Sequence, residues 1–329
     1  MGQVAMSIKY ISRRSILLLT LTIGMIYAYY YITVDSTEIL FTIYKTPDLS
    51  YKVINMNDRT PAYRLATLNG RRPYADGDRA QATIVNHLRL LERCQRDPSL
   101  VVVDVGAYLG DFGLYAAACG CQVYLFEVQP DMIDLIQTSI NVNDFPSSRV
   151  QLVHKAVTDL PSNSNLTFSI AGGSTTAANG TLSVSTIRLD DIQWPLNSKI
   201  FLLKIDVEGF ELHVLRSAQN LFRNQRIHHV IFEYTAFWPD RAAQKEVLPY
   251  VDKKLGAKNF YVLHRTGKDV YGPLDREKFD EFYEIHMKRC LQTDVYATFI
   301  DLPSNDMIKT KEKIFYRLFT FYACRCGIK

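Results

Sequence analysis

From residue 100 onward the chain alternates between short apolar runs and longer amphipathic segments. The apolar runs hold few polar residues, so they predict strands covered on both faces, as in a parallel sheet between two layers of helices. Seven such strands are expected, at 100–106, 122–128, 150–157, 200–207, 228–234, 259–264 and 295–300. One helix is expected before the first strand, at 76–96. The others are expected after the first strand up to about 118, and at 130–142, 209–220 and 241–255. The pattern therefore predicts an α/β fold with a doubly wound, mostly parallel sheet.

Residues 16–34 form a run of 19 residues without a charge, which is long enough to cross a bilayer. Three basic residues precede the run and two acidic residues follow it: Lys9, Arg13 and Arg14 before, Asp35 and Glu38 after. The positive-inside rule then places residues 1–15 in the cytosol and the remainder in a lumen or outside the cell. A cleaved signal peptide is the alternative, but its apolar region would be shorter and would end in small residues. We expect a single-pass type II membrane protein with an uncleaved signal anchor, in the ER or Golgi.

The remaining chain divides by pattern into three parts. Residues 35–76 show no sustained period and predict a stem, residues 77–303 hold the alternating domain, and residues 304–329 form a basic and apolar tail. A polar insert at 161–185 separates the third strand from the fourth and predicts a hairpin or loop. It carries two glycosylation sequons, which suit a lumenal domain. They begin at Asn165 and Asn179.

Charge and cysteine content exclude two classes of function. The net charge is only +4 and the basic residues are scattered, whereas nucleic-acid binding calls for a basic stripe on one face. The six cysteines include two Cys-x-Cys pairs, which is not the usual spacing of zinc ligands. We expect buried thiols or disulfides, no metal site and no nucleic-acid partner.

The turn after the first strand has the composition of a cofactor loop. In VVVDVGAYLGDFG (101–113), glycines at 106 and 110 allow a ligand to approach the backbone before a helix begins. Only one of the three glycines of a dinucleotide-binding turn is present. The acidic residues suit S-adenosylmethionine instead, with Asp104 facing its cationic amino-acid end and Glu127 accepting both ribose hydroxyls. The alternative is that both acids merely cap helices.

Three charged residues interrupt the apolar strand 200–207 and its end at a spacing of two. They are Lys204, Asp206 and Glu208. Ligands of doubly wound sheets bind beyond the carboxyl ends of the strands, where Asp206 and Glu208 fall. We expect one of these two to act as the base or clamp for an acceptor hydroxyl, with Lys204 pairing one of them and Glu233 completing a carboxylate cluster. The alternative is an internal ion-pair network that only fixes the turn.

The sequence resembles the FkbM family of S-adenosylmethionine-dependent methyltransferases through three blocks: VVVDVGAYLGDFG (101–113), LFEVQP with the following helix (125–143) and LLKIDVEGFELHVLRSA (202–218). The resemblance implies a Rossmann-like, seven-stranded sheet with an antiparallel last strand. It also implies O-methyl transfer, often to sugar or polyketide hydroxyls.

The resemblance also implies roles for individual residues. Eight positions match the cofactor site: Asp104, Gly106, Ala107, Tyr108, Gly110, Glu127, Asn143 and Ala156. Asp206, Glu208 and Gly209 match the reaction end, and Lys204 joins the two acids as a candidate catalytic residue from the strand pattern alone. One departure is Tyr108, where the family commonly has Asn.

Two functions from different classes follow. The first is a membrane-anchored, lumen-facing O-methyltransferase that uses S-adenosylmethionine on a hydroxyl acceptor such as a glycan. The second is a catalytically idle, methyltransferase-like protein that acts in secretory trafficking or protein interaction. Degenerate cofactor motifs would favour the second function. Because Asp104, Gly106, Gly110 and Glu127 are all present, the sequence favours the enzyme.

Overall fold

The computed structural model describes residues 50–68, 75–171, 174–177, 180–196, 198–237, 243–263, 269–302 and 308–310. The chain divides into two compact units, Met1–Thr46 and Pro47–Lys329. The predicted membrane anchor at 16–34 lies outside the described residues, as does most of the predicted tail. Among the helices of the described ranges, none is long and apolar enough to span a bilayer.

The second unit is built on a large mixed sheet. Within the described residues this sheet has eight strands in the order β13-β12-β14-β11-β10-β3-β4-β5. Their bounds are β3 Val101–Val105, β4 Gln122–Phe126, β5 Val150–Val153, β10 Ile200–Ile205, β11 Ile227–Tyr234, β12 Asn259–Leu263, β13 Val270–Tyr271 and β14 Thr293–Thr298. β14 runs antiparallel between β11 and β12, whereas β11, β10, β3, β4 and β5 are mutually parallel. The predicted Rossmann-like sheet with a reversed last strand is confirmed.

The sheet has one strand more than the seven predicted. The extra strand is β13, which pairs antiparallel with β12 at the edge of the sheet. It is only two residues long, so it is too short to show a periodic pattern in the sequence.

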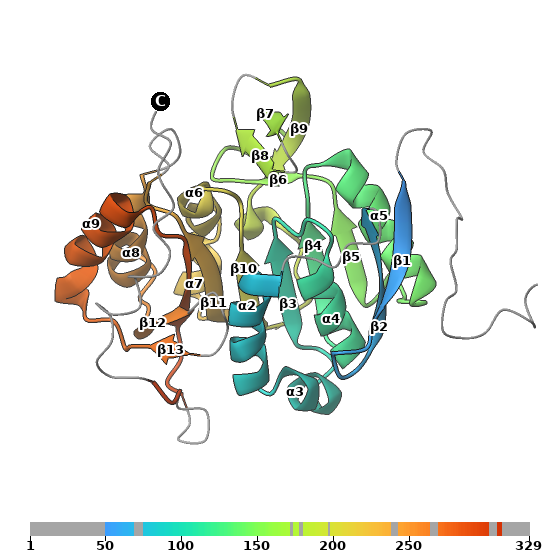
Figure 1. Cartoon of the computed structure of the whole chain (residues 1–329), viewed down its shortest axis with the longest axis horizontal. Coiled ribbons are helices and arrows are strands. Elements are labelled where there is room, and N and C mark those ends of the chain that lie inside the picture. The colour runs from blue at the N-terminus through green and yellow to red at the C-terminus, as the bar shows by residue number, and fades with distance from the viewer. Residues whose placement is uncertain are drawn as a thin grey trace, which may run out of the picture. The chain divides into compact units, whose positions relative to one another are not determined.

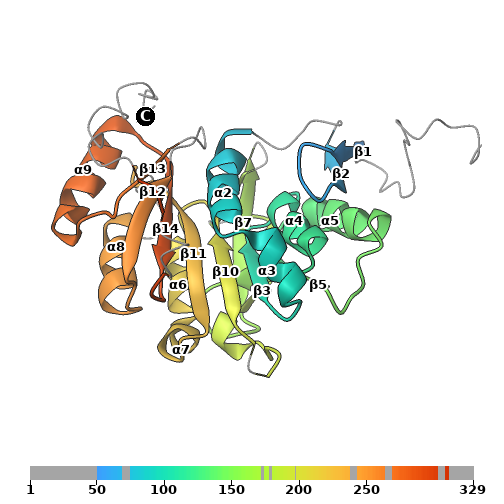
Figure 2. The same cartoon turned by 90° about the horizontal axis from the view of Figure 1, so that it is seen from below.

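Helices cover both faces of the sheet (Figures 1 and 2). One face carries α2 Ala75–His87, α3 Leu90–Arg96, α4 Asp111–Cys119 and α5 Pro130–Val142. The other carries α6 Glu211–Arg216, α7 Gln219–Arg223, α8 Gln244–Lys253 and α9 Phe279–Arg289. The predicted helix at 76–96 is split into α2 and α3, because Arg89 has a left-handed backbone with φ 50. No helix was expected where α9 lies.

The predicted third strand is also split. β5 stays in the main sheet, while β6 (Ala156–Val157) pairs with β9 (Leu182–Ile187) in a separate sheet of order β6-β9-β7-β8. β7 (Asn165–Ala171) and β8 (Ser174–Ala177) form an antiparallel pair, so the predicted insert contains a hairpin. Two short 3-10 turns, η2 (Leu189–Asp191) and η3 (Arg276–Lys278), complete the elements. Figure 1 shows β7, β8 and β9 standing beyond the carboxyl ends of the main strands.

Part of the predicted stem is folded onto the domain. β1 (Tyr51–Met56) and β2 (Tyr63–Leu68) form an antiparallel hairpin. β2 runs beside α5, where the Ala66 N–H donates to the Ser139 Oγ at 2.8 Å. Tyr63 and Leu65 are buried. Apolar residues on both faces of the hairpin contact the domain, and this packing holds a segment whose sequence shows no long period.

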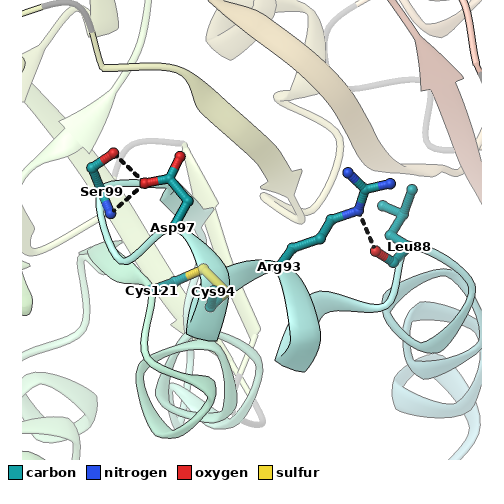
Figure 3. The surroundings of a disulfide bond; sticks show 6 residues. All are labelled: Leu88, Arg93, Cys94, Asp97, Ser99 and Cys121. Carbon is teal, nitrogen blue, oxygen red and sulfur yellow. Dashed lines mark hydrogen bonds between the residues drawn. A yellow bond between two sulfur atoms is a disulfide. The ribbon is translucent and has the colours of Figure 1, made fainter.

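A disulfide joins Cys94 of α3 to Cys121, just before β4 (Figure 3). Beside it, the Arg93 Nε donates to the Leu88 carbonyl oxygen at 2.9 Å. Cys290 is also disulfide-bonded, and Cys119 is a buried free thiol. A crosslink across 27 residues stabilises a fold by about 2–4 kcal/mol, chiefly by constraining the unfolded chain.

Candidate functional site

The turn after β3 packs directly against the turn after β10. Gly106, with φ +77, begins the first turn, and Gly110, with φ +78, ends it where α4 begins. A Cβ atom on Gly106 would lie 1.8 Å from the backbone oxygen of Asp206. Only glycine fits this contact. Ala107, the next residue, is buried.

Lys204 contacts both turns. Its Nζ lies 3.0 Å from Asp104 Oδ1 and 3.8 Å from Asp206 Oδ2, and it donates to the Gly106 carbonyl oxygen at 3.0 Å. Asp104 has no exposed surface, and its Oδ2 accepts from the Gly113 N–H in α4 at 3.1 Å. Asp104 therefore supports the loop from inside. Lys204 and α4 enclose its carboxylate, and its predicted contact with the amino-acid end of the cofactor, directly or through water, stays a prediction.

Burial is the largest influence on the pKa of Asp104. It raises the pKa of Asp104 to about 6, although Lys204 acts in the opposite direction. Burial would lower the pKa of Lys204, but the attraction of Asp104 and then of Asp206 outweighs it and raises that pKa. Both groups are therefore charged near neutral pH. For Lys204 and Asp206, the ion-pair alternative considered from the sequence agrees with these contacts.

Glu127 closes the other side of the loop. Its Oε2 accepts from the Tyr108 N–H at 2.7 Å, and its Oε1 accepts from the N–H groups of Val128 and Gln129 at 2.8 and 2.9 Å. Burial raises its pKa, and these three bonds act to lower it. A carboxylate offers about four acceptor positions, so roughly one is left. The predicted contact of Glu127 with both ribose hydroxyls of S-adenosylmethionine stays a prediction.

Tyr108 occupies its unusual position because of the hairpin. Its side chain packs with Tyr51, Val53 and Leu68 of β1 and β2 around a small apolar cluster. The residue also has a positive φ of 51, which places its N–H toward Glu127. An aromatic ring here covers apolar surface of the hairpin, whereas the Asn common in the family would not.

The two remaining predicted cofactor residues lie apart from each other. Ala156 is buried in a cluster that includes Val128, the residue after Glu127, so it stays beside the site. Asn143 is the C-cap of α5, about 20 Å along the helix from Pro130 at its start. Its amide binds the backbone N–H and carbonyl of Arg64 in β2, at 2.8 and 2.6 Å. The structure therefore makes Asn143 an anchor of the hairpin and does not bring it to the cofactor loop.

Glu211 binds the turn after β10, at the reaction end, and it was not among the residues predicted from the sequence. Its Oε1 accepts from the N–H groups of Val207 and Gly209 at 3.3 and 3.0 Å, and its Oε2 accepts from the Gln244 amide at 3.0 Å. Burial raises its pKa to about 7. Glu208, in the same turn, is half-buried with φ 57. A capping box would place Ser or Thr at the cap and the acid at the third helical position, whereas Glu211 begins α6 directly after Phe210, so the sequence shows no such signal.

Glu211→Gln should change how folding stability depends on pH. The folded protein raises the Glu211 pKa from 4.5 to about 7, so its contribution is full at low pH and is lost as the pH rises through about 7. Glutamine keeps an acceptor for the turn and removes this loss. We expect the wild type to lose on the order of 2 kcal/mol relative to the variant between about pH 5 and about pH 8. Urea unfolding at both pH values measures it. An equal change of the unfolding free energy with pH in the wild type and in Glu211→Gln would contradict the prediction. Exposed Glu246→Gln should keep the pH dependence of the wild type.

Further carboxylates gather at the same edge of the sheet. Glu233 ends β11 beside Asp294 of β14, and the negative charges of Asp206, Glu211 and Glu208 all act on it. The predicted addition of Glu233 to the acidic group is therefore present in the fold. In the part of the chain that the structure describes, no three His, Cys, Asp or Glu side chains are grouped so as to hold a metal ion.

Residues 104–263 match the family model of the methyltransferase FkbM domain, so the chain carries this domain there. The match indicates S-adenosylmethionine as the cofactor. Among curated proteins none matches the chain.

Several solved methyltransferase structures are similar at low identity. The N-terminal domain of human METTL16 in complex with SAH is 11% identical, with 70% of this chain and 73% of that chain covered and a TM-score of 0.38. A putative methylase from Haemophilus influenzae is 13% identical, with 68% and 98% covered and a TM-score of 0.35. The T. thermophilus 16S rRNA N2 G1207 methyltransferase is 12% identical, with 78% and 52% covered and a TM-score of 0.36. At these TM-scores the likenesses establish neither the reaction nor the acceptor.

Proposed function

We propose that this chain, which carries an FkbM methyltransferase domain, is an O-methyltransferase that transfers the methyl group of S-adenosylmethionine to a hydroxyl acceptor such as a glycan. We further propose that a single N-terminal helix anchors it in a membrane of the ER or Golgi, with the catalytic domain in the lumen. No nucleic-acid acceptor is proposed, because the basic residues are scattered along the chain.

One observation carries the proposal: the cofactor loop and the acidic turn are in contact. Gly106 touches the backbone of Asp206, and Lys204 lies between the two turns. Both follow parallel strands, so they meet at the edge where doubly wound sheets bind their ligands. A methyl donor held on the first turn thereby lies beside carboxylates on the second.

The chemistry asked of the chain is alignment and removal of a proton. S-adenosylmethionine supplies a methyl group on a positively charged sulfur, and an alcohol must lose its proton as it attacks. The Asp206 side chain is 35% exposed and Glu208 is half-buried, so both reach the surface of the site. We assign them the roles of proton acceptor and acceptor clamp. Lys204 keeps Asp206 in place.

Two features support the lumenal location. The disulfide between Cys94 and Cys121 requires an oxidising environment, such as the lumen of the secretory pathway. Asn165, the first residue of a sequon, is exposed on β7. The second sequon begins at Asn179, which lies outside the described residues.

Cofactor binding tests the enzyme directly. Isothermal titration of the full chain in detergent should show S-adenosylmethionine binding with a Kd between roughly 1 μM and 1 mM, the usual range for enzyme ligands. Glu127→Gln should weaken binding about tenfold or more, because a hydrogen bond to a charged acceptor is lost. Exposed Glu246→Gln should bind like the wild type. Absence of binding at about 1 mM cofactor would reject the methyltransferase function.

The second function, an idle methyltransferase-like protein in secretory trafficking or protein interaction, has one observation in its favour. Glu127 already accepts three backbone N–H groups, which leaves few positions for a cofactor. The same titration separates the two functions, because an idle protein would bind neither S-adenosylmethionine nor its product.

A further inference from the structure

Three buried oxygen atoms near the end of β11 and the start of α8 have no hydrogen-bond partner. They are Glu233 Oε2, Thr235 Oγ1 and Gln244 Oε1. Their residues are only 6%, 1% and 4% exposed. An unpaired buried polar group costs about 1–3 kcal/mol, so native proteins rarely leave several together without a ligand to satisfy them.

Glu233 and Gln244 lie next to the acidic group at the reaction end. The Gln244 amide nitrogen donates to Glu211 Oε2 and to the Gly209 carbonyl oxygen, which places this side chain beside Glu211. Glu233 accepts from the Gln292 amide through Oε1 alone, which leaves Oε2 unpaired. Two of the three unpaired atoms accept hydrogen bonds and cannot donate them. They are the amide oxygen of Gln244 and, when the acid is ionised, the carboxylate oxygen of Glu233.

The charges around Glu233 are all of one sign. Burial raises its pKa well above the ordinary value, and Asp206, Glu211, Glu208 and Asp294 raise it further. Lys204 is committed to Asp104 at 3.0 Å and to Asp206 at 3.8 Å. A positive charge supplied by a ligand would relieve this repulsion.

We infer that Asp206, Glu208, Glu211, Glu233 and Gln244 form a subsite for an ammonium group, and that the acceptor is a hydroxyl compound carrying a primary amine, such as an amino sugar. The inference rests on the proposed function and names its substrate class. An ammonium brings three donors and a positive charge to a site of unpaired acceptors.

An organic cation suits the site better than a metal ion. A metal ion needs several ligand atoms at about 2 Å from it, and the described residues hold no group of side chains that could supply them. Glu233 is buried, whereas Asp206 and Glu208 are partly exposed. The buried acid can hold the ammonium while the exposed pair reaches the hydroxyl to be methylated.

Three sugars that differ in one substituent test the subsite. Glucosamine, N-acetylglucosamine and glucose carry an ammonium, an acetamide and a hydroxyl at the same carbon. We expect saturation-transfer NMR on the full chain in detergent to show glucosamine binding at least tenfold more tightly than the other two. Equal responses to the three sugars, including no response to any, overturn the inference. Loss of the glucosamine response on addition of MgCl2 overturns it as well.

Variants locate the binding. Glu233→Gln, which keeps the shape and removes the charge, should reduce glucosamine affinity at least tenfold, and Asp206→Asn on the half-exposed side should also reduce it. Exposed Glu246→Gln should leave it unchanged. Unchanged affinity in both site variants rejects the subsite, and the second variant decides if the first does not fold.

The cofactor titration keeps the two proposals distinguishable. Binding of S-adenosylmethionine without a preference for glucosamine rejects the ammonium subsite alone. Preference for glucosamine without cofactor binding rejects the methyltransferase function and leaves the subsite as a binding site.

Discussion

Gly106→Ala is expected to destabilise the domain by about 2–5 kcal/mol and to abolish cofactor binding. Two costs add. An L-residue at φ +77 is strained by about 1–2 kcal/mol, and the new Cβ would lie 1.8 Å from the Asp206 backbone oxygen. Because the obstacle is backbone, it cannot rotate away as a side chain would, and the turns after β3 and β10 must separate, at a further cost of about 1–3 kcal/mol. Urea unfolding measures the loss.

Gly256→Ala is the matched control. Gly256 has φ +78, almost the value at Gly106, but nothing lies within 4 Å of the position its Cβ would take. It carries only the backbone strain, so we expect a loss of about 1–2 kcal/mol with cofactor binding retained. The difference between the two variants measures the contact of the turns. Equal losses would show that backbone strain alone requires the glycine.

Lys204→Met is expected to destabilise the domain by about 3–5 kcal/mol, because it leaves Asp104 as an unpaired charge with no exposed surface. The methionine has nearly the length of the lysine stem, so the loss comes from charge more than from packing. Chemical unfolding near neutral pH measures it. Exposed Lys245→Met, which also breaks an ion pair, should change stability by no more than about 0.5 kcal/mol.

A double variant tests the explanation. Asp104→Asn combined with Lys204→Met removes both charges, so it should recover much of the stability that the single lysine variant loses. A double variant no more stable than Lys204→Met would show that Lys204 acts through packing or through its bond to the Gly106 carbonyl oxygen instead. In either case, the fold depends on a residue that lies beneath the proposed reaction end.

Much of the fold could be predicted because its strands are apolar on both faces. β3, β10 and β11 are covered by helices on each side, so their side chains are almost all buried and the sequence shows an uninterrupted run. The short strand β13 and the hairpin of β1 and β2 were not predicted. β13 pairs through only two residues, and the hairpin strands show no alternation because residues on both hairpin faces pack against the domain.

The candidate site was predicted in its residue types but not in its contacts. Asp104, Glu127 and Lys204 were chosen for charge at strand ends, and all three lie at that edge. Their partners are backbone groups, Asp206 and one another. The position of Asn143 was inferred from the family, yet the length of α5 carries it to the far end of the helix. Sequence order cannot show which way a carboxylate turns.

The sequence alone determined the class of fold, the identity of the cofactor loop and the edge where it lies, because these depend on the pattern of apolar residues and on glycines with fixed spacing. Tertiary structure decided which acids are enclosed and which remain open to a substrate. Asp104 and Glu211 are surrounded by α4, the turn after β10 and α8, whereas Asp206 keeps 35% of its side chain exposed. The physical reason is that the burial and pKa of a carboxylate depend on what packs around it, and those neighbours come from parts of the chain far away in sequence.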